Sequence, residues 1–312
     1  MGDNEANRQR RRTQVGTMLR QRIAAGQFEG NRAVFARLTG AFFRAVLIAL
    51  LVAMPSLLLS GVAPDTAQIV IILAMLSAGL VFVEYFGKSP SIIEFRFAPP
   101  YNRLRFGALA ATVLILSLIM RGTTEPNALN ILLSYAGTQV GLALDFPYSP
   151  VRLTLLMLPE TTSVANVATV RMAAGVAYGM SIVMLLVFLV IVRLFWWPVR
   201  RRAFNVWINL PLFDPTGGGD VLNKLGRDSS VNISLGFLLP FLVPAGIKAA
   251  SGLVDIQSIL SPQPLIWTMC IWAFVPATMI MRGIAMNRIS ELIRAKRRRA
   301  YAQADADGLQ TA

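Results

Sequence analysis

The sequence predicts an all-α, polytopic membrane protein with six transmembrane helices and both termini in the cytoplasm. Its 312 residues are 55% hydrophobic and only 15% charged, whereas about a quarter of the residues in a soluble domain are charged. Apolar blocks of about 20 residues, enough to cross ~30 Å of hydrocarbon, recur along the chain. Arginine and lysine gather in alternate connections between these blocks. Together these observations favour a bundle of membrane-spanning helices.

The six apolar blocks divide the chain into three regions. Residues 1–40 form a basic, amphipathic N-terminal segment, 41–281 the transmembrane domain, and 282–312 a basic C-terminal helix with a disordered tail. The first block is not expected to be a cleaved signal, because it starts forty residues in and a second block follows almost at once. The predicted spans cover residues 41–61, 67–87, 106–120, 172–194, 233–254 and 264–281.

The basic residues predict the orientation. The two terminal segments and the connections after the second and fourth blocks hold 24 of the 30 arginines and lysines, whereas the opposite connections hold only Arg121, Arg152 and Arg171. Positive charge favours the cytoplasmic side of a membrane. We therefore expect both termini inside. Arginine outnumbers lysine 26 to 4, which hints at a GC-rich bacterial genome and hence at the inner membrane.

Residues 127–146 are apolar enough to be a seventh span. One extra crossing there would export either the N-terminal arginines or the arginines at 200–202. We therefore expect an outer interfacial or re-entrant helix between the third and fourth spans. The following residues 151–159 alternate weakly, which suits a short strand or the return arm of that segment.

The connection 209–228 has three consecutive glycines, at 217–219, between Asp214 and Asp220. A phosphate-binding loop is not expected, because Asp220 follows the glycines where that motif needs lysine. A membrane aspartyl protease is not expected either, because no predicted span contains an aspartate to share a proton with Asp220. The simpler reading is a turn, with Asp220 capping a short helix 221–225 that Gly226 ends.

Two predicted spans contain polar or helix-bending residues. Glu84 lies four residues before Lys88 at the end of the second span, as a local ion pair or as a proton-coupling carboxylate. In the fifth span Lys248 follows Pro240 and Pro244. These three residues suit a substrate site in a bent helix, or ordinary packing with a lysine that reaches the headgroups.

Several residues are expected at lipid headgroups or at helix contacts. The basic ends favour an anionic membrane surface over nucleic acid, because apolar residues share a helical face within each, such as Val15, Leu19 and Ile23. Gly175 and Gly179 have the spacing that lets two membrane helices approach closely, within the chain, in a homo-oligomer or against another subunit. The expected headgroup contacts are Trp196, Trp197, Arg200, Arg201, Arg202, Arg297, Arg298 and Arg299.

No cofactor or metal site is expected, because histidine is absent and the single cysteine, Cys270, lies in the sixth span, where packing is its simplest role. Three functions stay open. The first is a non-catalytic scaffold, assembly factor or accessory subunit of a membrane complex. The second is a small permease or lipid transporter that uses the proline-broken fifth span. The third is an enzyme on a lipid-linked substrate, with Asp214, Asp220 and the arginines at 200–202 around a phosphate.

Overall fold

The computed structural model of the protein describes residues 34–87, 91–195, 197–198, 209–213, 220–250 and 256–306. These residues form helices and loops, with no strand among them. The predicted all-α class and six spans are confirmed, because six helices are long and apolar enough to cross a membrane. They are Val34–Leu58, α2 (Pro64–Phe86), α3 (Tyr101–Arg121), α6 (Val164–Leu194), α8 (Val221–Ala249) and α10 (Pro262–Ala306).

Three shorter helices lie in the connections: α4 (Ala128–Leu144), α5 (Pro150–Leu156) and α9 (Ile256–Ile259). Helix α4 is the apolar segment expected between the third and fourth spans, and its 17 residues leave it shorter than the six spanning helices. The short strand considered for 151–159 is wrong. Ser149 accepts a hydrogen bond from the Arg152 amide and Pro150 occupies the first turn, so this stretch begins a helix.

All six spanning helices begin before their predicted starts, and in α6 and α8 a side chain caps the helix in polar sequence. Ser163 accepts a hydrogen bond from the Asn166 amide and starts α6. Asp220 accepts one from the Leu222 amide, so the predicted cap is confirmed. The short helix ending at Gly226 is wrong, because α8 continues to Ala249. A glycine inside a helix costs only about 1 kcal/mol relative to alanine, which the packing of a long helix outweighs.

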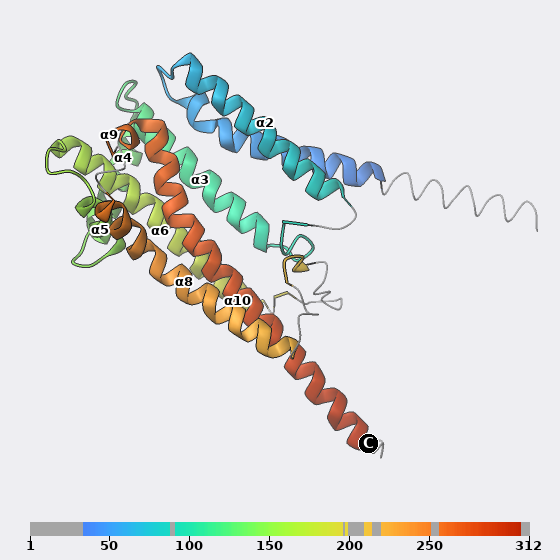
Figure 1. The fold of residues 1–312 in the computed structure, drawn as a ribbon. Coiled ribbons are helices and arrows are strands. Elements are labelled where there is room, and N and C mark those ends of the chain that lie inside the picture. The colour runs from blue at the N-terminus through green and yellow to red at the C-terminus, as the bar shows by residue number, and fades with distance from the viewer. Residues whose placement is uncertain are drawn as a thin grey trace, which may run out of the picture.

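Consecutive spans run in opposite directions, so the bundle has two ends (Figure 1). We call the end that bears Val34, Tyr101 and Val221 the terminal face, because α10 also emerges there, and the other end the opposite face. Helix α10 has no break at 282, where the predicted transmembrane domain ends, and it continues past 303 to Ala306. At ~1.5 Å per residue its 45 residues extend ~68 Å. Its last turns project beyond the other helices (Figure 1).

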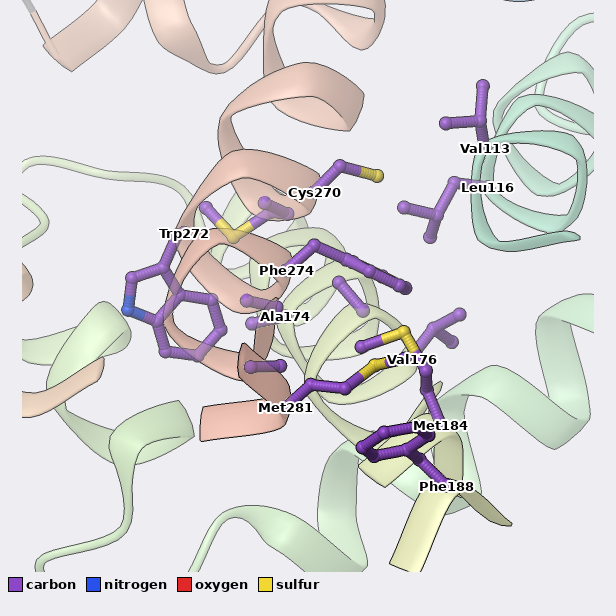
Figure 2. Packing of buried hydrophobic residues seen from close by; sticks show 14 of the residues in the cluster. Val113, Leu116, Ala174, Val176, Met184, Phe188, Cys270, Trp272, Phe274 and Met281 are labelled. Atoms are coloured by element: carbon purple, nitrogen blue, oxygen red, sulfur yellow. The ribbon is translucent and has the colours of Figure 1, made fainter. Parts of the chain in front are cut away.

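The core lies where α3, α6 and α10 meet (Figure 2). Val113 and Leu116 of α3 face Cys270 of α10, whose thiol is free and buried, so this cysteine is part of the packing. Phe188 of α6 and Met281 of α10 are fully buried in the same cluster. At about 1.5 to 3 kcal/mol for each large apolar side chain removed from a polar medium, such packing fixes three helices as one unit. Inside lipid, close van der Waals contact takes over that role.

Close backbone approaches join the remaining helices to this core. A β-carbon on Gly236 of α8 would lie 2.6 Å from the carbonyl oxygen of Pro276 in α10. Ser229 donates a hydrogen bond of 2.8 Å to the Gly283 carbonyl of α10. A β-carbon on Gly175 of α6 would lie 2.5 Å from the Cα of Gly141 in α4. Small residues at these points let the backbones touch.

The first span and α2 form a hairpin beside this body (Figure 1). Among the described helices, α2 packs closely against none from α3 to α10. Near the opposite face, the Ser60 hydroxyl donates to Glu125 at 2.5 Å and Gln263 donates to the Ser56 hydroxyl at 2.9 Å. Leu51 is the hairpin side chain that belongs to the buried core. The hairpin therefore meets the body through its first helix and a few polar contacts.

Candidate functional site

A cavity of about 790 Å³ separates the hairpin from the body in the half near the terminal face. We call it the hairpin cavity. Its walls come from the first span, the end of α2, the loop before α3, the first turns of α3, and α10. This volume lies in the usual range for small-molecule sites, about 300 to 1,000 Å³. The residues that matter below are Arg44, Leu47, Ile48, Leu51, Glu94, Arg96, Arg103, Arg105, Leu109, Phe274 and Arg282.

One end of the hairpin cavity is strongly basic, with five arginines and a single carboxylate, Glu94, among its lining residues. Glu94 accepts two hydrogen bonds from Arg282 of α10, at 2.7 and 2.9 Å. The Glu94 side chain is 8% exposed and that of Arg282 is 25% exposed. This bidentate pair neutralises one arginine and ties the loop before α3 to α10.

Arg96 is held by the end of α2. Its guanidinium donates to the carbonyls of Glu84, Tyr85 and Gly87, at 2.6 Å for Tyr85 and 3.0 Å for Gly87. These carbonyls have no partner within the helix, and a cation there also meets the negative end of the helix dipole. Burial lowers the pKa of Arg96. Arg96 is thus a cap on α2, which keeps its positive charge but has donors of its guanidinium occupied by these carbonyls.

Glu84 stabilises the same loop from the other direction. The backbone amides of Ser91, Ile92 and Ile93 donate to its carboxylate at 3.1 to 3.2 Å, and the Ser91 hydroxyl donates to it as well. The carboxylate therefore holds this loop against α2. Lys88, its expected partner, lies outside the described residues.

The other three arginines of the cavity have no carboxylate within ion-pair distance among the described residues: Arg44, Arg103 and Arg105. Arg44 donates to its own helix at the Gly40 carbonyl, 2.6 Å away, and lies 4.7 Å from the centre of the Tyr85 ring. Arg105 lies 5.5 Å from the ring of Tyr101. Aromatic faces attract cations without neutralising them. Two helices therefore bring uncompensated positive charge to one end of the cavity.

Most of the remaining cavity wall is apolar, with Asn102 and Thr278 among its polar residues. Leu47, Ile48 and Leu51 continue from Arg44 along the first span, and Leu109 continues from Arg105 along α3. Arg44 and Leu51 are seven residues apart, so this wall extends ~10 Å from the basic end. Phe43 also lines the cavity and is 64% exposed on a spanning helix. The cavity therefore reaches the surface that acyl chains cover.

The structure gives the prolines of α8 a packing role. Pro244 has no amide hydrogen, so the Pro240 carbonyl loses its partner in the helix. The indole of Trp272 in α10 donates to that carbonyl at 3.1 Å. Pro240 and Pro244 are buried, while Lys248 is exposed in the last turn of α8. None of these three residues lines the hairpin cavity, and a substrate site at them stays a prediction.

Replacing Trp272 with phenylalanine tests this packing role. An aromatic ring is kept, but the buried Pro240 carbonyl loses the hydrogen bond that the indole donates to it. We expect unfolding in detergent to become easier by about 1 to 2 kcal/mol. Thermal unfolding followed by circular dichroism measures the change. Val275→Ala, on an exposed part of α10, is the control and should have a smaller effect. Equal stability of Trp272→Phe and the native chain would contradict the packing role.

The predicted headgroup contacts divide into two groups. Trp196, Arg200, Arg201 and Arg202 lie outside the described residues. Trp197 was expected at the headgroups, but the structure corrects this: it is 4% exposed and packs among Phe95, Tyr101 and Phe188. Its indole donates to the Ala98 carbonyl at 3.2 Å, so a partner inside the protein replaces the polar headgroup layer.

The basic end of α10 has a different environment. Arg297 pairs with Asp220 at 3.0 Å, which ties α10 to the start of α8. The Leu222 amide and Arg297 lower the pKa of the Asp220 carboxyl. Asp220 therefore serves as a helix cap and ion-pair partner, while Asp214 and the glycines at 217–219 lie outside the described residues. Arg298 and Arg299 are exposed, and their contact with headgroups stays a prediction.

The three arginines of the opposite face all have acidic partners. Arg121 pairs with Glu125 at 2.6 Å, and Arg152 and Arg171 pair with Asp145 at 2.5 and 2.8 Å. Asp145 itself is only 5% exposed. Lys248, exposed in the last turn of α8, is the basic residue that the described part of this face holds outside these pairs.

No family model matches the chain, and no similar protein was found among the curated proteins or the solved structures. The sequence and the fold make this chain a multi-pass helical membrane protein. The arginines of the hairpin cavity were missed as a site in the sequence, where they served only to indicate orientation. Arg44 could have indicated the site from the sequence. It is a cation inside a predicted span, and because a cation in lipid is costly, its presence there points to a function.

Proposed function

We propose that this chain is a non-catalytic membrane protein that binds a membrane amphiphile in the hairpin cavity. The observation that carries the proposal is the division of the cavity into a basic end and an apolar wall that reaches the lipid-covered surface. An amphiphile has a polar headgroup that suits the basic end and an apolar chain that suits the apolar wall. The proposal keeps the lipid-transport hypothesis and moves its site from the fifth span to the hairpin.

The way the hairpin is attached supports this proposal. A ligand must enter from the membrane, so one wall of its site has to move at low cost. The second helix of the hairpin packs closely against none of the described body helices. Hydrogen bonds from Ser60 to Glu125 and from Gln263 to Ser56 join the hairpin to the body near the opposite face. Opening at the terminal face would leave these two contacts in place, but it would have to carry along or release the loop before α3, which Glu84 and Arg96 hold against the end of α2.

Filling the cavity tests the proposal. Leu109→Trp adds a large ring to the apolar wall, and Ile72→Trp adds the same ring to the exposed surface of α2. We expect the native chain and Ile72→Trp to retain lipid through purification in mild detergent, and Leu109→Trp to retain several-fold less. Native mass spectrometry counts the bound lipids, and thermal unfolding checks that both variants fold. Equal retention by the two variants would refute the proposal.

A scaffold or accessory role is the second candidate, favoured by the basic end of α10 that projects beyond the start of α8 (Figure 1). Exposed arginines on a free helix suit an acidic partner surface. A chain that ends at residue 297 keeps the contact with Asp220 and removes this projection. Loss of co-purifying proteins from that shortened chain would favour the accessory role, and their retention would count against it.

The orientation belongs to the same proposal. We place the terminal face in the cytoplasm of a bacterial inner membrane, since the segments at that face hold most of the arginines and lysines and the three arginines of the opposite face are paired. An alkaline phosphatase fusion at the C-terminus should then be inactive, and a fluorescent protein fused there should fluoresce. The reverse pair of results would overturn the orientation.

A further inference from the structure

Resting on the proposed function, we propose that the ligand of the hairpin cavity is a lipid with an anionic phosphate headgroup. The phosphate binds between Arg44 of the first span and Arg103 and Arg105 of α3, and an acyl chain lies along Leu47, Ile48 and Leu51. The headgroup therefore bridges the hairpin and the body.

Charge decides the headgroup class. Arg282 is neutralised by Glu94, and Arg96 is bound to the carbonyls at the end of α2. Three guanidinium groups then remain for a ligand. Each presents a planar fork of donors that matches two oxygens, so three of them exceed the two oxygens of a carboxylate. The oxygens of a phosphate accept hydrogen bonds from several arginines, and basic pockets between membrane helices are known to suit such headgroups.

The position of the three arginines favours a lipid over a soluble phosphate as the ligand. Arg103 and Arg105 lie in the first two turns of α3, and Arg44 lies beside Tyr85, which is in the last turn of α2. All three are therefore near the terminal face, where we expect the phosphates of one leaflet. The apolar wall begins one to two turns deeper, at Leu47 and Leu109, and extends ~10 Å from the basic end. Inorganic phosphate would leave this wall unfilled. A phospholipid fills both parts in the orientation it already has in that leaflet.

The phosphate also explains why an uncompensated cluster is stable. Like charges brought together from two helices repel one another, and α2 packs against none of the described helices from α3 to α10. A bound anion replaces that repulsion with attraction to both sides. The ligand is therefore expected to hold the hairpin against the body.

Titration of lipids into the full-length protein in mild detergent, read by native mass spectrometry, tests the headgroup assignment. The probes are phosphatidylglycerol, phosphatidylcholine, oleate and inorganic phosphate. We expect phosphatidylglycerol to bind about tenfold more tightly than phosphatidylcholine, because a net negative headgroup meets uncompensated arginines. The triple variant Arg44→Gln, Arg103→Gln and Arg105→Gln should lose this preference. The triple variant Arg294→Gln, Arg298→Gln and Arg299→Gln loses the same charge on α10 and should keep it.

Each other outcome has a distinct meaning. Equal binding of phosphatidylcholine and phosphatidylglycerol overturns the anionic headgroup but leaves an amphiphile site intact. Oleate bound as tightly as phosphatidylglycerol overturns the phosphate assignment. Inorganic phosphate that displaces phosphatidylglycerol at equal concentration overturns the role of the acyl chain. If Leu109→Trp binds phosphatidylglycerol as well as the native chain does, the lipid lies outside the cavity, and the proposed function fails with this inference.

Discussion

The variant Glu94→Ala is expected to destabilise the protein by about 3 kcal/mol or to prevent its isolation in folded form. It leaves Arg282 without its bidentate partner, and Arg282 is three-quarters buried in the middle of α10. Breaking a buried ion pair on one side typically costs about 3 to 5 kcal/mol, because the remaining charge stays without compensation. Because Arg282 is partly exposed, we expect a loss of stability at the lower end of this range. Thermal or denaturant unfolding in detergent measures the effect.

A second variant separates the charge effect from lost packing. In Glu94→Ala with Arg282→Met the uncompensated charge is gone, and a side chain of similar length remains on α10. Replacing both members of a buried pair with apolar groups is often nearly neutral. We therefore expect the double variant to recover most of the lost stability. A single variant as stable as the native chain would show that this pair does not hold the loop on α10.

Gly236→Ala should have the next largest effect on stability. The added β-carbon would lie 2.6 Å from the Pro276 carbonyl oxygen and 2.7 Å from a carbon of Ile280. The first of these is a backbone atom, so α8 and α10 must separate along their contact. Overpacking of this kind costs about 1 to 3 kcal/mol. The loss is expected in the unfolding free energy and in the yield of monodisperse protein.

Gly226→Ala is the matched control, because it makes the same substitution in the same helix. No atom lies within 4 Å of a β-carbon at Gly226. Alanine there removes only the helix penalty of glycine, so stability should rise by about 0.5 to 1 kcal/mol. The two substitutions are thus expected to change the free energy of unfolding in opposite directions. If both raised stability, the close contact of α8 with α10 would be refuted.

The class of the fold was predictable because lipid imposes a simple requirement. Each span needs about 20 apolar residues with satisfied backbone hydrogen bonds, and hydropathy detects that requirement directly. The predicted ends of the spans were less accurate. Helix α8 begins at Val221 and not near 233. The polar residues after Asp220 are helical, but a hydropathy pattern detects only apolar stretches and does not show them. Helix ends depend on caps, which are local and short.

The contacts between helices were only partly visible in the sequence. Gly175 has the spacing typical of helix contacts and does touch another helix, but its partner is Gly141 of α4. Gly246 has the same kind of spacing with Ala250, yet no atom lies within 4 Å of a β-carbon there. Gly236 has no such pattern and makes one of the closest contacts of α8. Which glycine meets a neighbour depends on how each helix is rotated, and composition does not encode that rotation.

The hairpin cavity could not be predicted from the sequence for a related reason. Its charged residues come from positions 44 to 282 and meet only after four separate elements have packed. One or two arginines in each element look like ordinary interfacial cations. Their shared location is a property of tertiary structure, as is the pairing of Arg282 with Glu94 across 188 residues of sequence.

The unbroken course of α10 makes the cavity and the projecting tip mechanically continuous. Arg282 lines the cavity, and the same helix extends ~36 Å further to Ala306 without a loop or a proline after Pro276. A rigid rod transmits rotation and tilt along its whole length. We therefore expect a load applied to the tip to reach the wall beside the basic end, and filling of the cavity to change the angle of the tip.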